Sequence, residues 1–343
     1  MGKDHVFLRA CRREPTEYTP VWLMRQAGRY MKEYRKIRRK VSFLDLCKSP
    51  DLAAEITLLP VQKLGVDAAI IFGDILLPLE GMGIHLEFTK GGGPVIRNPI
   101  GDEEDIERLR IIDPEKHVPF LLKAIEIVRR ELKERVPLIG FAGAPFTLSS
   151  YLIEGGRSAD YSKTKGLMLD APSWWHRLME KLTEVTIRYL KAQVHHGAQT
   201  LQLFDSWAGC LSPWDYEAHV LPYSKRVIQE VREQAPVIHF SVGTGGFPHL
   251  IKEAGGDVIG IDWRTDLGGG WERLGYDVSI QGNLDPSVLL ASRQVIELHV
   301  RRILESAGKR PGHIFNLGHG VLPETPEENV IFMVETVHRF SRR

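Results

Sequence analysis

Eight short apolar segments alternate with longer helical patterns along the sequence, and this alternation constrains the fold more than any other feature. The segments lie at 21–25, 68–73, 138–142, 200–204, 237–241, 257–262, 278–281 and 313–317. Most are continuous apolar runs, as expected for parallel strands that are buried on both faces. Eight strand–helix units in 343 residues predict an α/β fold, namely a (β/α)8 TIM barrel that forms a single domain over residues 1–343.

The helical patterns between these segments support the barrel, with an open doubly wound sheet as the alternative. The clearest helix covers 173–196, with Ser173 as its N-cap and Gly197 as its stop. A second helix is expected at 116–135, where apolar residues recur at near-helical spacing. No G-x-G-x-x-G sequence joins a strand to a helix, which disfavours a Rossmann-type sheet.

The segment between the second and third predicted strands has a different character. Residues 84–98 contain two extended stretches on either side of Gly91, Gly92 and Gly93. A glycine triplet can bind phosphate at a helix N-terminus, but no helical pattern follows this one. We therefore expect a β-hairpin inserted after the second strand.

The composition excludes several classes of protein. With 43% hydrophobic and 26% charged residues, the chain is typical of soluble globular proteins. A net charge of +1 disfavours a dedicated nucleic-acid-binding protein. The sequence has neither the apolar core of a signal peptide nor a membrane-spanning stretch, so no membrane association is expected. Three widely spaced cysteines provide no disulfide framework, which favours the cytoplasm.

Positive charge is concentrated near the N-terminus. Eight lysines and arginines, but only one acidic residue, lie within 25–40. The run begins directly after a predicted strand with Arg25-Gln26-Ala27-Gly28-Arg29. Arginine presents a planar set of donors that matches carboxylate and phosphate, and glycine lets a ligand approach the backbone closely. The run is therefore either a binding site for a small polyanion or a solvated basic helix face, and the second interpretation explains 32–40 well.

Polar side chains follow the other predicted strands, where the active sites of (β/α)8 barrels lie. These candidates are Asp74, Tyr151, Asp205, Ser206, Thr244, Asp262, Asn283 and His319. Their convergence on one rim would give an enzyme site. Each one alone is also compatible with a helix cap or a turn. Asp74 lies between apolar runs and far from an obvious cap, which favours a functional role.

The sequence offers little for metal binding or covalent catalysis. No H-x-x-x-H or H-E-x-x-H pattern occurs, and Ser241 stands two residues after His239, where a zinc site would need a thiolate. No G-x-S-x-G sequence is present, and no cysteine lies beside a plausible base. We therefore expect neither a bound metal nor a covalent acyl intermediate.

Several long segments resemble the uroporphyrinogen decarboxylase family. They are PVWLMRQAGR at 20–29, IIFGDIL at 70–76, GFAGAPFTLSSYLIEG at 140–155, QLFDSWAG at 202–209 and NLGHG at 316–320. The resemblance extends over nearly the whole chain. It implies a (β/α)8 barrel, in agreement with the strand count, and a homodimer that needs neither a metal nor an organic cofactor.

The resemblance also implies a substrate and a set of site residues. Members of this family convert four acetate side chains of uroporphyrinogen III to methyl groups, which yields coproporphyrinogen III in haem biosynthesis. By resemblance, Arg25 and Arg29 bind substrate carboxylates, and Asp74 accepts hydrogen bonds from the pyrrole N–H groups. Substrate contacts are also implied for Gln26, Ala27, Gly28, Arg38, Tyr151, Ser206 and His319.

This reaction gives the residue types a chemical reason. A neutral pyrrole accepts the electron pair of the departing carboxylate only after protonation at a ring carbon, and an ionised Asp74 would stabilise the resulting cation. Because the pKa of arginine exceeds ~12, Arg25 or Arg29 could supply the proton only from a strongly perturbed site or through water. Two alternatives stay open: a zinc-dependent methyltransferase on a similar barrel, and a non-catalytic protein that binds anions or nucleic acid.

Overall fold

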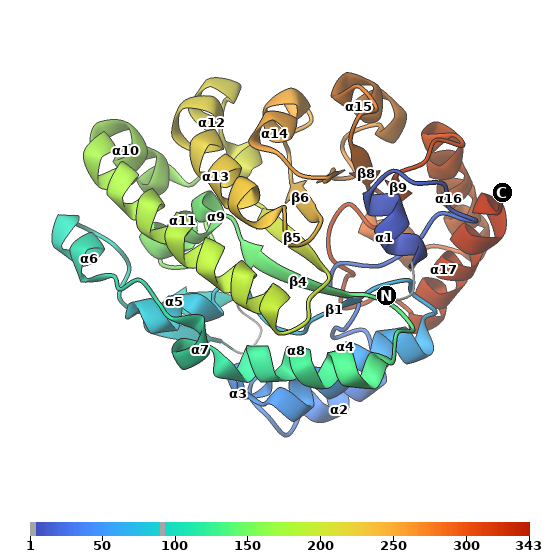
Figure 1. Cartoon of the computed structure of the whole chain (residues 1–343), viewed down its shortest axis with the longest axis horizontal. Helices are drawn as coiled ribbons and strands as arrows, with labels where there is room; N and C mark the ends of the chain where they lie inside the picture. The colour runs from blue at the N-terminus through green and yellow to red at the C-terminus, as the bar shows by residue number, and fades with distance from the viewer. Residues whose placement is uncertain (1–4, 90–92) are drawn as a thin grey trace.

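Seven parallel strands form one curved sheet in the computed structural model, which describes residues 5–89 and 93–343. The order along the sheet is β1-β4-β5-β6-β7-β8-β9 (Figure 1). The strands are β1 (Ala69–Ile70), β4 (Leu138–Gly143), β5 (Thr200–Asp205), β6 (Val237–Ser241), β7 (Val258–Gly260), β8 (Ser279–Gln281) and β9 (His313–Ile314). Each one overlaps a predicted segment, so the expected parallel α/β arrangement is confirmed.

An extended segment at Val21 occupies the eighth position of the barrel, between β9 and β1. Val21 forms a parallel bridge with Phe315, just beyond β9. On its other side, the Val21 carbonyl accepts a hydrogen bond of 2.7 Å from the amide of Asp67, just before β1. The barrel is thus TIM-like, as predicted. The full strand expected at 21–25 is wrong, because the chain turns at Arg25, where φ is 59°.

Helices connect the strands and lie around the outside of the sheet (Figure 1). They are α1 (Val6–Cys11), α2 (Lys32–Arg38), α3 (Phe43–Lys48), α4 (Pro50–Lys63), α5 (Leu77–Met82), α6 (Glu103–Arg108), α7 (Pro114–His117), α8 (Pro119–Leu132), α9 (Pro145–Glu154), α10 (Ser162–Asp170), α11 (Pro172–His195), α12 (Pro213–His219), α13 (Leu221–Val231), α14 (Pro248–Ala254), α15 (Leu267–Leu274), α16 (Arg293–Ala307), α17 (Glu327–Ser341) and the 3-10 helices η1 (Ala208–Cys210) and η2 (Pro286–Leu290). Within the described part of the chain, none of them combines the length and apolarity needed to cross a membrane.

Prolines set helix boundaries that differ from the predicted ones. α11 begins at Pro172 with Ala171 at its N-cap, so Ser173 is not the cap that the sequence suggested. The single helix expected at 116–135 is two helices, because Pro119 begins α8 and the residue before a proline avoids the helical conformation. Both prolines stand at the start of a helix, where the missing N–H costs no hydrogen bond.

Side chains from opposite sides of the sheet meet inside the barrel. Trp22 Nε1–H donates to Gln281 Oε1 at 2.8 Å, and Gln281 Nε2–H donates to Gln202 Oε1 at 3.1 Å. Since β5 and β8 are not neighbours in the sheet, Gln202 and Gln281 reach each other through the interior. The ring of half-buried Phe204 lies beside that of buried Phe240, with centroids 5.9 Å apart. The barrel is therefore a packed core, and a ligand has access only at its rim.

A two-stranded antiparallel sheet lies outside the barrel, after α5. β2 (Leu86–Phe88) pairs with β3 (Pro94–Ile96). These strands stand where the hairpin was expected, but its turn residues 90–92, with Gly91 and Gly92, lie outside the described residues. The backbone of β3 also contacts the loop after α9, where Val95 bridges Gly156. The small sheet therefore supports that loop against the barrel.

Candidate active site

Several predicted site residues lie where the parallel strands of the barrel end. Arg25 follows the extended segment at Val21, and Asp74 follows β1. Ser206 follows β5 directly, and His319 lies in the loop after β9. Tyr151 is on α9, the helix that comes directly after β4. Since the carboxyl ends of parallel strands meet at one rim, the fold brings these residues to the same side of the barrel.

Arg25 contacts the loop that carries His319. The left-handed φ of Arg25 turns the chain sharply after the extended segment, a conformation that non-glycine residues adopt rarely. Its side chain packs against Gly320, where an added Cβ would lie only 2.4 Å from Arg25 Cδ. A glycine at 320 is therefore required for this approach. The Met24 carbonyl also accepts a hydrogen bond of 3.0 Å from Val321 N–H, which joins the two loops.

Asp74 has both a structural and an electrostatic role at the rim. Its Oδ1 accepts a hydrogen bond of 2.9 Å from Leu76 N–H, just before α5. Asp74 is not the N-cap of α5, which is Leu76, but this hydrogen bond makes Asp74 part of the turn before the helix. Burial of the carboxyl raises its pKa to about 6, opposed by the Leu76 N–H and by the positive charge of Arg25. Asp74 is ionised at neutral pH but protonates in mildly acidic solution.

His319 is neutral and acts as a hydrogen-bond donor. Burial, together with the positive charges of Arg25, Arg157 and Arg264, lowers its pKa to about 4. Its Nδ1 lies 2.7 Å from Gly320 N–H and accepts that hydrogen, so Nε2 carries the imidazole proton. His319 therefore offers one uncharged N–H group to a ligand.

Tyr151 and Ser206 add hydroxyl groups to the same rim. Burial and the nearby charge of Asp74 raise the pKa of Tyr151 to about 12, so its hydroxyl stays protonated. The Tyr151 ring lies 5.9 Å from the ring of Trp207, the residue after Ser206. Ser206 and Trp207 line a cavity of about 800 Å³ at the rim. Together these residues provide neutral donors around one anionic and one cationic side chain.

The remaining predicted residues lie close in sequence but are placed differently. The Gln26 amide is buried, accepts from Leu23 N–H at 3.1 Å and donates to the Ala68 carbonyl at 3.2 Å. Ala27 is half-buried against the core, whereas Arg29 is exposed. Arg38 donates to the Val41 carbonyl and lies 5.7 Å from the Phe43 ring centre. Within the basic run, Arg25 packs against the loop of His319 and acts on Asp74 through its charge.

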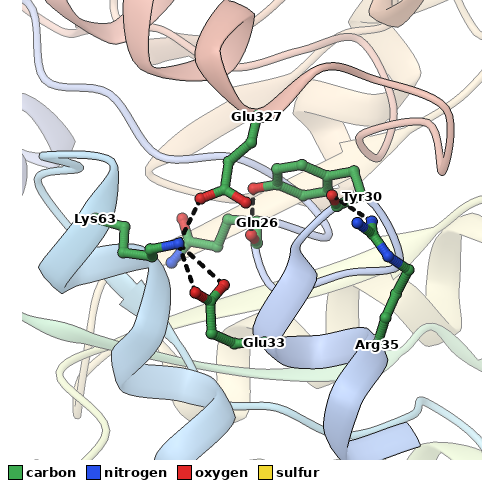
Figure 2. Close-up of polar contacts among 6 residues, drawn as sticks. All are labelled: Gln26, Tyr30, Glu33, Arg35, Lys63 and Glu327. Carbon is green, nitrogen blue, oxygen red and sulfur yellow. Dashed lines mark hydrogen bonds and ion pairs between the residues drawn. The ribbon is translucent and has the colours of Figure 1, made fainter. Parts of the chain in front are cut away.

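Hydrogen bonds from α2 hold the turn that carries Arg25 and Arg29 (Figure 2). Arg35 Nη1 donates to the Arg29 carbonyl at 2.7 Å. It also donates to the Tyr30 carbonyl at 2.6 Å, and the Tyr30 hydroxyl donates to the Gln26 carbonyl at 2.5 Å; these residues are drawn in Figure 2. The basic run is therefore not a uniformly solvated face, because Arg35 is bound to the backbone of the turn.

An ion-pair cluster anchors α2 to the rest of the barrel. In Figure 2, Lys63 on α4 lies between two carboxylates, with Nζ 2.9 Å from Glu33 and 2.6 Å from Glu327. Glu33 is on α2 and Glu327 begins α17, so three helices far apart in the sequence meet at this lysine. The N-terminal end of α2, which holds the arginine turn, is thus fixed by this ion pair.

Comparison with known proteins identifies the family to which this chain belongs. The family model "Uroporphyrinogen decarboxylase (URO-D)" matches residues 3–340. The chain belongs to the uroporphyrinogen decarboxylase family. A protein of that name from Carboxydothermus hydrogenoformans is 59% identical over 339 residues, which cover 98% of this chain and 97% of the relative. Another from Syntrophotalea carbinolica is 53% identical over 343 residues, 100% of this chain and 99% of the relative.

A solved structure of low sequence identity shows the same architecture. A methyltransferase from Methanosarcina mazei superposes with a TM-score of 0.81 over 98% of each chain, at 19% sequence identity. At this identity the likeness concerns the fold alone. The resemblance to the uroporphyrinogen decarboxylase family found in the motifs is thus confirmed by both sequence comparisons.

The zinc-ligand pattern that the sequence lacked is not replaced by another one in the described residues. No three His, Cys, Asp or Glu side chains among them are grouped so that they could hold a metal ion. His239 is buried, with Nδ1 3.2 Å from the Gly255 carbonyl, and the Ser241 hydroxyl lies 2.6 Å from that of Thr244. His239 and Ser241, the two residues at the position of the zinc-type pattern, therefore both form local hydrogen bonds.

Two arginines at the rim of this family member escaped sequence reasoning. Arg157, in the loop after α9, and Arg264, in the loop after β7, line the cavity next to Ser206. Neither arginine belongs to a motif or a basic run in the sequence, so each looks like an ordinary surface arginine. The only available signal was the position of Arg264 just after a predicted strand end, beside Asp262 and Trp263.

Proposed function

We propose that this chain decarboxylates uroporphyrinogen III to coproporphyrinogen III, as a carboxy-lyase of porphyrin biosynthesis, without a metal or an organic cofactor. The observation that supports this most directly is that a half-buried carboxylate, Asp74, lies at the rim of the barrel within the electrostatic influence of a cation, Arg25, which packs against the loop of His319. The substrate combines pyrrole N–H donors with eight carboxylates. A site for it needs an acceptor for the first and cations for the second.

We assign the binding roles as the family resemblance suggests. Arg25 and Arg29 bind side-chain carboxylates, and Arg38 contributes a further positive charge. Asp74 accepts hydrogen bonds from the pyrrole N–H groups. Tyr151, Ser206 and the Nε2–H of His319 donate to the substituents, and the backbone of Gln26, Ala27 and Gly28 forms the adjoining wall. The buried Gln26 amide acts by holding the turn, since its hydrogen bonds go to the protein backbone.

The proposed chemistry has three proton transfers for each acetate, two to the substrate and one from it. A proton first adds to a ring carbon, which turns the pyrrole into a cation that ionised Asp74 stabilises. The bond between the acetate methylene and its carboxylate then breaks. CO2 departs, and the electron pair forms an exocyclic double bond that neutralises the cation. A second proton adds to the methylene carbon to give the methyl group, and the ring carbon returns its proton. Overall, one proton is consumed and one CO2 is released.

The first proton requires a donor beside Asp74. Arg25 is a cation whose charge acts on this carboxyl, but a guanidinium with a pKa above ~12 is a weak acid. A water molecule held by Arg25 could donate the proton with a smaller change in pKa than the guanidinium itself would need. We therefore assign Arg25 and Arg29 to positioning the carboxylates and the proton-carrying water.

We further propose that the protein is a cytoplasmic homodimer built from one domain over residues 1–343. Support comes from the loop and helix after β5, where Trp214 is 84% exposed on α12. An exposed apolar side chain of this size next to an active-site rim favours an interface. Localisation in the cytoplasm is in keeping with free thiols at Cys11, Cys47 and Cys210.

Anaerobic incubation with uroporphyrinogen III tests the function. The purified protein, with no added cofactor, should convert it stepwise to a product with four fewer carboxyl groups. Chromatography of the oxidised porphyrins measures this conversion. Unchanged uroporphyrinogen after incubation with folded protein would refute the proposal. Transfer of a methyl group to a thiol acceptor instead would favour the methyltransferase alternative.

A further inference from the structure

The cavity beside Ser206 contains two arginines that the proposed site does not use. Arg157 comes from the loop after α9 and Arg264 from the loop after β7, and both line this space of about 800 Å³. Trp207 and Tyr161 form part of the same wall, so the cavity combines apolar surfaces with two cations. A macrocycle with acidic side chains is complementary to both properties, because its rings are apolar and its carboxylates are negatively charged.

Arg264 is held in position without a ligand. Its guanidinium stacks over the Trp263 ring, 4.2 Å from the ring centre, and its Nη1 lies 3.0 Å from Asp262 Oδ2. The same carboxylate accepts from Gly243 N–H at 2.6 Å and from the backbone N–H of Arg264 at 3.0 Å. Because a guanidinium has five N–H donors, this arrangement orients Arg264 and leaves donors for an anion.

The small antiparallel sheet positions Arg157. Ile96 N–H donates to the Gly155 carbonyl at 2.8 Å, and Val95 bridges Gly156. Both contacts lie immediately before Arg157 in the chain. The side chain of Arg157 is exposed, and no carboxylate of the described residues forms an ion pair with it. An arginine without an ion-pair partner, presented at a cavity by an anchored loop, is available to bind an anion.

Both arginines act electrostatically on the proposed site. After burial and Arg25, they are the next causes that lower the pKa of His319, and Arg157 also acts on Tyr151. The Trp263 ring, on which Arg264 stacks, also lies 6.4 Å from the His319 ring, so one large ligand can contact both regions. The added positive potential attracts carboxylates to this side of the rim.

We propose that Arg157 and Arg264 form a second carboxylate-binding subsite, which holds a side chain of the substrate apart from those bound by Arg25 and Arg29. This inference rests on the proposed function, whose substrate carries more carboxylates than two arginines can bind. Acetate and propionate side chains both present the required group. Trp207 links the two regions, since it lines the cavity beside Ser206 and its ring lies 5.9 Å from that of Tyr151.

The subsite is tested with Arg157→Gln, Arg264→Gln and the double variant. Arg130→Gln on α8 serves as the control, because Arg130 is exposed and lies on a helix outside the cavity. Loss of one charge-assisted hydrogen bond should raise KM for uroporphyrinogen about tenfold per variant, with kcat within about twofold of wild type. The double variant should raise KM by about 30-fold or more, and Arg130→Gln should behave as wild type.

Comparison of substrate and product identifies the side chain that is bound. Coproporphyrinogen retains the propionates but has lost the acetate carboxyl groups. If a propionate occupies the subsite, the variants should weaken inhibition by coproporphyrinogen by the same factor as they raise KM. If an acetate occupies it, product inhibition should stay unchanged while KM for uroporphyrinogen rises.

A binding measurement separates this inference from the proposed function. Uroporphyrin, the oxidised macrocycle with the same carboxylates, is fluorescent and binds without turnover. Weaker uroporphyrin binding by the double variant, with unchanged binding by Arg130→Gln, supports the subsite even if the wild type fails to decarboxylate uroporphyrinogen. In that case the proposed function alone is refuted. An unchanged KM together with unchanged uroporphyrin affinity in the double variant would overturn the subsite.

Discussion

Asp74 is the side chain whose charge the proposed reaction uses most directly. Asp74→Asn removes that charge but keeps an oxygen that can accept from Leu76 N–H, so the turn before α5 should persist. Loss of a preorganised stabilising group should lower kcat by at least about 10²-fold. Steady-state kinetics and circular dichroism of the variant check this result. Near-normal turnover by a folded Asp74→Asn enzyme would rule out the electrostatic role.

The pH dependence provides a second readout of the same carboxylate. Because burial raises the pKa of Asp74 to about 6, the free enzyme should lose its active, ionised form as pH falls through that value. The kcat/KM of the wild type should therefore rise with pH across about pH 5–7, and this limb should be absent from the residual activity of Asp74→Asn. A limb of the same position in both proteins would assign it to another group.

Arg29 tests whether the basic turn binds carboxylates through paired hydrogen bonds or through diffuse charge. Arg29→Lys keeps the charge and loses the planar set of donors, so it should weaken substrate binding by roughly 1.5–3 kcal/mol with little change in Tm. Lys32→Ala and Lys40→Ala, both at exposed positions, should have little effect on kcat/KM. Equal losses in all three variants would indicate diffuse attraction and contradict the proposed contact.

At the scale of elements, α2 determines how the arginine turn is held. Arg35→Met removes the donor to the Arg29 and Tyr30 carbonyls, which leaves two acceptors without this partner. We expect KM to rise about fivefold with kcat nearly unchanged, and Tm to fall by a few degrees, as for a lost hydrogen bond of about 1 kcal/mol. Lys36→Met, an exposed change on the same helix, is the matched control.

The split between KM and kcat separates positioning from mere stability. Arg35→Lys restores one donor and should recover part of the lost affinity. If Arg35→Met lowers Tm but leaves KM unchanged, Arg35 supports the helix alone and does not position Arg29.

Individual elements show what the sequence could and could not predict about the fold. The segments at 138–142, 200–204 and 237–241 are almost entirely buried strands, and their continuous apolar runs identified them within a residue. The segment at 21–25 was read as a full strand because Trp, Leu and Met follow Val21. The turn depends on the left-handed backbone of Arg25, and no pattern of side chains in the sequence predicts that conformation. Pro119 does indicate a helix boundary, but the apolar periodicity on both sides of it favoured one continuous helix.

At the scale of the whole molecule, the site combines loops that the sequence separates widely. Motifs identified Asp74, Ser206 and His319 because each follows a strand of the barrel, where position carries information. Arg157 gave no such signal, since its place at the rim depends on contacts between β3 and the loop after α9. Local sequence therefore predicts residues at strand ends and misses cations that long-range packing brings to the same cavity.

The absence of metal chemistry is a prediction about the whole protein. Because no ligand cluster was expected from the sequence, the purified enzyme should contain no stoichiometric zinc and should keep full activity after prolonged treatment with a chelator. Elemental analysis and the anaerobic assay measure both quantities. Stoichiometric zinc, with activity lost to the chelator and restored by the metal, would contradict cofactor independence.

The proposed homodimer makes the last prediction, which concerns the exposed surface after β5. Trp214 is 84% exposed at the start of α12, and leaving its ring in water is unfavourable compared with burying it between two subunits. Light scattering of the wild type at micromolar concentration should give twice the mass of the 38.9 kDa chain. Trp214→Lys should shift the protein toward the monomer, because a charge would then be buried at the interface. Glu217→Lys on the same helix provides a comparison for added charge alone. A wild type that is strictly monomeric and fully active would refute the dimer, and a Trp214→Lys protein that stays dimeric would place the interface on another face.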